Sequence, residues 1–343
     1  MNSAQWNTLL KVINGEQLKE RPIGFIIDSP WLPGWYNTSA LDYFSDASLW
    51  FDSNMKAINE FPDVMFLPGF WSEFGMCTEP SAFGSKLVWS ETSHPHPAKI
   101  LEGSAALAAL KKPNVSTDGL LPLTLKRLSI YDKKIKEAGH MTRFAVSRGP
   151  LNIASFLFGT TELMLAMAMT PDDVKKGLET ITDFITDWIE LQMKTIKDID
   201  GIFILDDIIG FLGDDDFKTF VLPYMKKIYG SFNVSVKFLH NDAAGLVCAP
   251  YLNEIGINLF NFSFNHSFDE MKKLTNNKVT LLGNLPPRDV LAAGSEDDIR
   301  AGVKEMMGSV NDHSGIIWSC GGGMPPEVST QNINAFIKAV KEY

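Results

Sequence analysis

Short apolar runs recur along the chain, and each one ends abruptly at polar or turn-forming residues. Runs of this length, several of them rich in Val, Ile and Phe, are typical of strands buried on both faces of a parallel sheet. Eight such runs are found, at residues 22–27, 63–67, 142–146, 201–205, 234–239, 258–262, 279–282 and 315–318.

Helical patterns fill the intervals between these runs. Thr170 followed by Pro171 and Asp172 is typical of a helix start, and apolar residues recur at helical spacing from Val174 to Leu191. Strands alternating with helices predict an α/β fold, the (β/α)8 or TIM barrel. An open doubly wound sheet is the main alternative, but no Gly-x-Gly-x-x-Gly motif follows the first run to support a dinucleotide site.

The whole chain, residues 1–343, is predicted to be a single barrel domain. The interval from about 70 to 140 is longer than one strand–helix unit needs. We expect this interval to form an excursion over the barrel mouth that acts as a lid.

Composition narrows the classes of function. The chain is 45% hydrophobic and 21% charged, which is ordinary for a globular protein, and its net charge is −10. This charge argues against nucleic acid and against an anionic membrane surface as partners. The chain contains no run of about 18 apolar residues, so the sequence predicts no membrane span. Three cysteines in so long a chain are no disulfide framework, so a cytoplasmic location is expected.

The chemistry-bearing residues follow the fourth, fifth and eighth runs. Asp206 and Asp207 come after the fourth, His240 and Asp242 end the fifth, and Cys320 ends the eighth. In a barrel these strand ends meet at one mouth, where active sites lie. Zinc accepts His nitrogen, Cys sulfur and carboxylate oxygen, so these residues can form a metal site. A lone His at a strand end is, however, more often only hydrogen-bonded.

The predicted ligand set is His240, Asp242 and Cys320. Asp206 or Asp207 could replace one ligand, orient His240, or supply a proton during catalysis. Two plainer readings remain open, because Asp242 could cap the next helix and Cys320 could be a small buried apolar residue.

Several segments resemble the uroporphyrinogen decarboxylase superfamily. Residues 206–210 and 217–224 look like its Asp-Asp, Gly and Phe-x-x-x-x-x-Pro-Tyr stretch, 283–287 look like its Gly-Asn-Leu-Asp-Pro segment, and 323–327 look like its Gly-Ile-Pro-Pro-Asp turn. The similarity covers nearly the whole chain in order. It implies a (β/α)8 barrel, and we expect Asn284 and His266 to contact the substrate at the mouth.

The decarboxylase activity does not follow from this resemblance. Those enzymes carry an Arg-Gln-Ala-Gly-Arg motif after the first strand, which grips a polycarboxylated tetrapyrrole. Here the same place holds Asp28, Trp31, Trp35 and Tyr36, which suit a small, largely apolar or aromatic ligand. The alternative for these aromatic residues is packing of the N-terminal segment against the barrel.

The other branch of the superfamily consists of zinc-dependent methyltransferases that use a corrinoid (cobalamin) carried on a separate protein. Members that methylate a thiol show His-x-Cys at the strand end and a later Cys, where this chain has Asp242 and Gly322. A metal with fewer thiolate ligands is a harder Lewis acid and favours an oxygen substrate.

The resemblance therefore implies the methyltransferase component of an O-demethylase. Such an enzyme would contain zinc and move a methyl group from a small methoxylated, aromatic substrate to the cobalt of a corrinoid-binding partner protein. The alternatives are a methylcobamide:thiol (coenzyme M-type) methyltransferase, a decarboxylase, and a barrel that binds ligands without catalysis.

Overall fold

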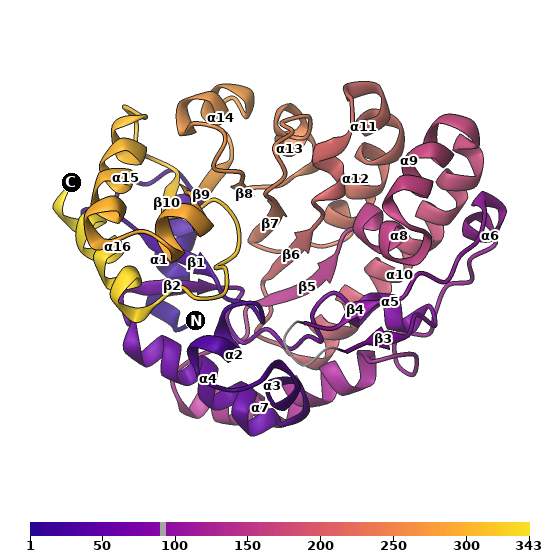
Figure 1. The fold of residues 1–343 in the computed structure, drawn as a ribbon, viewed down its shortest axis with the longest axis horizontal. Coiled ribbons are helices and arrows are strands. Elements are labelled where there is room, and N and C mark those ends of the chain that lie inside the picture. The colour runs from indigo at the N-terminus through magenta and orange to yellow at the C-terminus, as the bar shows by residue number, and fades with distance from the viewer. Residues whose placement is uncertain (90–93) are drawn as a thin grey trace.

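The computed structural model describes residues 1–89 and 94–343, and a curled sheet of eight parallel strands forms its centre (Figure 1). All eight apolar runs form strands of this sheet, which confirms the predicted α/β barrel fold. Neighbouring strands follow the order β2-β1-β10-β9-β8-β7-β6-β5. The strands are β1 (Ile23–Ile26), β2 (Val64–Leu67), β5 (Phe144–Arg148), β6 (Gly201–Leu205), β7 (Val236–Asn241), β8 (Leu259–Phe262), β9 (Thr280–Leu285) and β10 (Ile316–Cys320).

Most helices lie on the outer side of the sheet, as expected when helices connect parallel strands (Figure 1). The longer helices are α1 (Ser3–Ile13), α4 (Ala47–Glu60), α7 (Leu121–Glu137), α8 (Pro150–Phe158), α9 (Thr160–Met169), α10 (Pro171–Thr195), α12 (Leu222–Gly230), α15 (Glu296–Gly308) and α16 (Thr330–Glu342). The shorter ones are α2 (Leu32–Trp35), α3 (Ala40–Ser45), α5 (Thr78–Ala82), α6 (Ser104–Ala108), η1 (Ile208–Phe211), α11 (Asp214–Phe220), η2 (Ala249–Tyr251), α13 (Leu252–Ile255), α14 (Phe268–Leu274) and η3 (Pro287–Ala292).

Two apolar clusters lie on opposite faces of the sheet. The inner cluster fills the barrel with residues such as Phe203, Phe238 and Ile317, and the outer cluster packs strands against helices. Helix α1 contributes Trp6 and Leu9 to the inner cluster, so it packs against the barrel interior. Because side chains alternate along a strand, membership of a cluster tells which face each strand residue occupies.

The sheet has a seam between its two end strands, β2 and β5. No backbone pairing joins them in the described part of the chain. The side-chain amide of Gln192 instead accepts from Val146 N–H at 3.0 Å and donates to Val146 C=O at 2.9 Å. Glu79 accepts from Arg148 N–H at 3.1 Å. Side chains therefore satisfy backbone groups of β5 that would pair with β2 in a closed eight-stranded barrel.

The interval 70–140 contains α5, α6, α7 and a two-stranded hairpin, β3 (Leu87–Val88) with β4 (His96–Pro97). His94, beside the hairpin, has its Nε2 atom 2.6 Å from the carbonyl oxygen of Ser29, which follows β1. This contact brings the interval to the C-terminal end of a barrel strand. Its action as a lid stays a prediction, as does the single-domain organisation.

Among the described residues, no single helix has the length and apolar composition needed to span a membrane. The bent pair α8 and α9 meets those criteria only when its two helices are taken together.

Candidate active site

His240 and Asp207 reach the barrel mouth because of strand alternation. In β7, Phe238 belongs to the inner cluster and Leu239 to the outer one, so His240 points inward. In β6, Leu205 is an inner residue, which turns the next residue outward and Asp207 inward again. Both side chains therefore project into the same space at the C-terminal ends of their strands.

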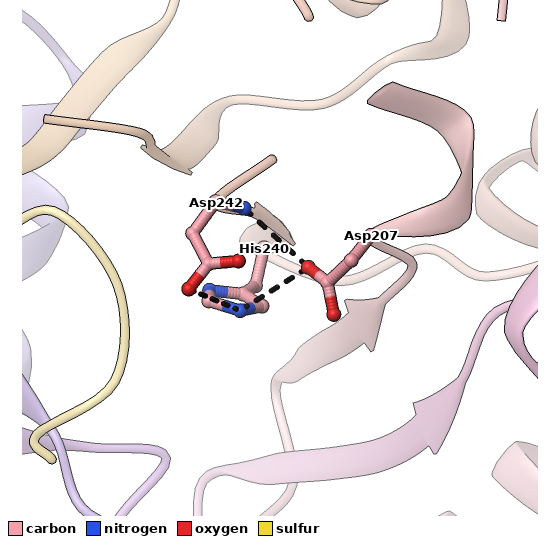
Figure 2. Close-up of side chains that lie close together, drawn as sticks. All are labelled: Asp207, His240 and Asp242. Carbon is pink, nitrogen blue, oxygen red and sulfur yellow. Dashed lines mark hydrogen bonds and ion pairs between the residues drawn. The ribbon is translucent and has the colours of Figure 1, made fainter. Parts of the chain in front are cut away.

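Asp207, His240 and Asp242 form a compact group at this mouth (Figure 2). Asp207 Oδ1 lies 3.4 Å from His240 Nε2, and Asp242 Oδ2 lies 4.0 Å from the same nitrogen. One ligand atom from each residue lies within 4.8 Å of the other two. His240 is buried, whereas about two fifths of each carboxylate side chain is exposed. The group is therefore reachable from outside and anchored from within.

Asn261 fixes the proton on the ring of His240. The Nδ2 group of Asn261 donates to the carbonyl oxygens of Leu282 at 2.9 Å and Cys320 at 3.4 Å, so its Oδ1 must act as an acceptor. His240 Nδ1 lies 2.7 Å from that oxygen and donates to it. The lone pair of the neutral ring is then on Nε2, the atom that faces the two carboxylates.

Glycine residues allow the loops after β6 and β7 to approach each other closely. Gly245 lies so close to the carbonyl of Gly210 that a Cβ at either position would collide with the opposite loop. A Cβ at Gly322, in the loop after β10, would lie 2.7 Å from Asp242 Oδ2. Close backbone approach at these positions thus sets where Asp207 and Asp242 stand.

Burial raises the pKa of Asp242, and the nearby Asp207 carboxylate raises it further, while His240 opposes the rise. The two carboxylates share this small space, and the negative charge of Asp207 disfavours ionisation of Asp242. A divalent cation would relieve that repulsion. The donor chemistry of the group, one imidazole nitrogen and two carboxylate oxygens, is a set that zinc accepts.

Asp206 serves a different purpose from Asp207. Its carboxylate is fully buried and accepts from Leu151 N–H at 2.9 Å and Asn152 N–H at 3.1 Å, at the first turn of α8. Burial raises the pKa of Asp206 well above its usual range, while these backbone hydrogen bonds act in the opposite direction. Asp206 therefore anchors a helix, and the structure does not bring it into the metal group.

Cys320 also lies outside the group, contrary to the predicted ligand set. Ile317 is an inner residue and Trp318 an outer one, so the alternation turns Cys320 toward the outer cluster. Its thiol donates to the carbonyl oxygen of Gly322 at 3.4 Å. Burial raises its pKa to about 12, which disfavours the thiolate that a metal would need. Asp207, and not Cys320, is the third residue beside His240 and Asp242.

Asp28, which follows β1, and Arg148, at the end of β5 next to β6, add further polar groups to the mouth. Both occupy inward positions, two residues after the inner residues Ile26 and Val146. Arg148 lies 3.4 Å from Glu73, and its guanidinium sits over the ring of Trp71 at 5.3 Å from the centroid. A second polar cluster thus lies at the mouth.

The aromatic residues after β1 pack against the barrel instead of reaching the metal group. Trp31 is fully buried in the outer cluster, and its indole N–H donates to the carbonyl oxygen of Val328 at 2.9 Å. Trp35 stacks on Trp31 and donates to Thr330 Oγ1 at 3.0 Å. Tyr36 lies beside them beneath the ammonium of Lys56. This placement favours packing over a role as pocket lining.

His266 and Asn284 connect two loops that lie next to the site. His266 Nε2 lies 2.6 Å from the carbonyl oxygen of Ala244, and its Nδ1 lies 3.1 Å from Glu270. Asn284 donates to the backbone carbonyl of His266. These contacts tie the loop after β8 to the loop after β7, which carries Asp242.

Sequence reasoning did not single out Asn261, Arg148 or Glu73. Asn261 stands at an inward position in an otherwise apolar strand, and Arg148 stands at the inward end of β5. Alternation identifies both of them once the inner face of each strand is known. Glu73 lies in an irregular segment after β2, where no periodic signal exists.

Fold and site together define an α/β barrel with a candidate metal centre at the C-terminal ends of its strands. The sequence model of the uroporphyrinogen decarboxylase (URO-D) family matches residues 7–343, and the chain belongs to this family.

Two relatives are named uroporphyrinogen decarboxylase. The one from Chloroherpeton thalassium is 29% identical over 180 residues, which cover 50% of this chain and 49% of that protein. The one from Alcanivorax borkumensis is 22% identical over 98% of this chain and 97% of its own length. The chain thus spans about half the length of the first relative and nearly all of the second.

A solved structure described as a methyltransferase from Methanosarcina mazei has the same fold. It superposes with a TM-score of 0.81 at 17% sequence identity and covers 98% of each chain.

Proposed function

We propose that this protein is a zinc-dependent methyltransferase that moves a methyl group from a small methoxylated substrate to the cobalt of a corrinoid on a partner protein. The observation that carries the proposal is the geometry of His240. Its Nε2 lone pair faces two carboxylates, while Asn261 holds the proton on Nδ1. A neutral imidazole held in that orientation offers Nε2 to a metal ion.

The residues present fit a divalent metal. Bonds of about 2.0–2.2 Å place the ligand atoms of a tetrahedral zinc about 3–4 Å apart, close to the separations within the group. Asp207, His240 and Asp242 would supply three ligands, and a fourth position would face the mouth. When bound, the metal would supply Lewis acidity to the oxygen from which the methyl group departs.

The ligand types favour an oxygen substrate over a thiol. The group contains no sulfur, because position 242 is Asp and the Cys320 thiol faces the outer cluster. Carboxylate ligands leave the metal harder than thiolates do, and hard metals prefer oxygen. This argument disfavours the thiol methyltransferase alternative.

A decarboxylase is also disfavoured, although relatives carry that name. Residues 28–36, which follow β1, contain no arginine to grip the carboxylates of a tetrapyrrole. The fold likeness to the Methanosarcina methyltransferase supports the methyl-transfer branch of the proposal and leaves the substrate to experiment.

Metal analysis is the first experiment. We expect the purified protein to hold about one zinc per chain and His240→Ala to hold much less. His96→Ala is the matched control, because that imidazole is exposed on β4 and is no part of the group. Equal zinc contents in all three proteins would remove His240 from the site.

Turnover is the second experiment. Methoxylated aromatic and aliphatic compounds are incubated with the protein and free cob(I)alamin, and methylcobalamin is followed by its absorbance. We expect methyl transfer from at least one ether that disappears in His240→Ala. Transfer from thiols or amines only would contradict the proposal.

A further inference from the structure

Asp28 stands across the mouth from the metal group. A Cβ placed on Gly323 would lie 2.9 Å from Asp28 Oδ2, and a Cβ on the adjacent Gly322 would lie 2.7 Å from Asp242 Oδ2. Two consecutive glycines thus separate the carboxyl of Asp28 from that of Asp242. A small molecule bound at the metal group would be within reach of both.

The surroundings of Asp28 disfavour its ionised form. Its Oδ1 atom is buried and has no hydrogen-bond partner in the described structure. Burial raises the pKa of Asp28 well above its usual range, Glu73 and Asp242 raise it further, and Arg148 lowers it. The residue as a whole is partly exposed, and its Oδ2 atom is the one that faces the glycines after β10.

The other acids of the site are less suited to deliver a proton. Asp206 is committed to the N-terminus of α8, and Glu79 accepts from Arg148 N–H at the seam of the sheet. Asp207 and Asp242 belong to the metal group. Glu73 accepts from Ser29 N–H and pairs with Arg148, which leaves Asp28 as the carboxyl without such a commitment among these acids.

We propose that Asp28 is the catalytic acid that delivers a proton to the departing oxygen of the methoxylated substrate. This inference rests on the proposed function and adds a specific residue to it. It moves the proton-donor role from Asp206 or Asp207, to which the sequence pointed, to the other side of the mouth.

The step balances in atoms and electrons. The bond between the methyl carbon and the ether oxygen breaks, and its electron pair stays on the oxygen. The methyl carbon forms its new bond with an electron pair of cobalt(I) on the partner. The carboxyl proton of Asp28 passes to the oxygen, which gives a neutral alcohol or phenol, and water later returns a proton to the Asp28 carboxylate near Arg148.

The test is a series of aryl methyl ethers that differ only in the acidity of the phenol released. A general acid matters most when the leaving oxygen is strongly basic. We expect Asp28→Asn to slow methyl transfer about 100-fold or more for the least acidic phenol, and less than about 10-fold for a strongly acidic nitrophenol. The slope of log rate against phenol pKa should therefore steepen.

Glu79→Gln is the matched control, because Glu79 is also a buried acid whose pKa burial raises. Its slope should equal that of the wild type. Zinc content should be unchanged in both variants. Infrared spectra add a readout that is independent of turnover: Asp28→Asn should remove a protonated-carboxyl band that is present in the wild type at pH 7.

The outcomes separate the two proposals. An active wild type whose rates fall equally for all ethers in Asp28→Asn, or do not fall, would overturn the role of Asp28 and leave the proposed function standing. Absence of the infrared band would overturn the role as well. A wild type that demethylates no ether would overturn the proposed function and, with it, the acid that serves it.

Discussion

At the scale of single residues, the amide of Asn261 determines whether His240 can bind a metal. Replacing it in Asn261→Leu removes the acceptor for Nδ1–H and frees the ring to change its tautomer or orientation. We expect zinc affinity to fall about 10–100-fold, as is usual for groups that orient metal-bound histidines. Competition with a chromophoric chelator measures this change.

Asn332→Leu is the control for this prediction. Asn332 is also buried, and its amide donates to three backbone carbonyls of the segment 291–294, far from the metal group in the fold. Both variants should lose stability because buried carbonyls lose donors. Equal zinc affinity in the two variants would mean that Asn261 acts on stability alone.

His140 predicts how stability depends on pH. Burial lowers its pKa to about 4, with a smaller contribution from the α-amino group of Met1, whereas an unfolded histidine titrates near 6.5. Below pH 6.5 the unfolded chain therefore takes up a proton that the folded chain does not. Stability should fall as pH drops from about 6.5 to 4, by about 2–3 kcal/mol from this residue.

Urea unfolding at several pH values checks this prediction. His140→Phe keeps an aromatic ring near Phe70 and cannot be protonated. Its stability should change less between pH 6.5 and 4 than that of the wild type. An identical slope in both proteins would show that His140 is protonated equally in the folded and unfolded states.

The sequence identified the residues of the candidate metal group more readily than the side chains that contact them, such as Asn261. His240, Asp207 and Asp242 follow strand-like runs, and the rule that barrel sites form at strand ends places them at the mouth. The alternation of inner and outer positions was needed to decide that Asp207, and not Asp206, faces the candidate metal group. The same alternation was needed to exclude Cys320 from that group. That alternation could be read only once the inner face of each strand was known.

At the scale of elements, the adjacent acids after β6 separate helix anchoring from metal binding. Asp206→Ala removes the acceptor of two N–H groups at the start of α8 and should cost about 2 kcal/mol of folding free energy. Zinc content should persist in the folded protein. Asp207→Ala should change stability by no more than about 0.5 kcal/mol and reduce zinc binding.

Denaturant unfolding and metal analysis of both variants test this division. The two substitutions differ by one position in sequence, so general effects of removing a carboxylate cancel in the comparison. Zinc loss in Asp206→Ala without a loss of stability would place Asp206 in the metal group and contradict the geometry of α8.

All eight strands were predictable because each is a short apolar run that ends at turn residues. The seam could not be predicted, because nothing in the sequences of β2 and β5 tells whether these two strands are hydrogen-bonded to each other. Packing of α1 against the barrel interior also escaped prediction, since its residues Trp6 and Leu9 show only that the helix has one apolar face.

At the scale of the whole molecule, the seam means that side chains, and not a paired strand, satisfy the backbone at the free edge of β5. Gln192, on α10, replaces both backbone bonds that a neighbouring strand would give to Val146. Glu79 does the same for Arg148 N–H, so the segment 70–140 and helix α10 both cover this edge of β5. The same strand carries Arg148 to the mouth, so the seam and the site share β5.

Gln192→Leu should therefore loosen the barrel at its seam. The substitution keeps the apolar bulk and leaves the N–H and C=O of Val146 without partners in a buried place. Each unsatisfied group costs about 1–3 kcal/mol, so we expect a loss of about 2–5 kcal/mol in urea unfolding. Gln331→Leu, which removes a hydrogen bond to Glu296 at the surface, should cost less than about 0.5 kcal/mol.

In Gln192→Leu, hydrogen exchange should accelerate at the Val146 amide far more than at the amides of β8, which is paired on both sides. Equal acceleration in β5 and β8 would mean that the barrel opens as one unit and that the seam is no weaker than the rest of the sheet.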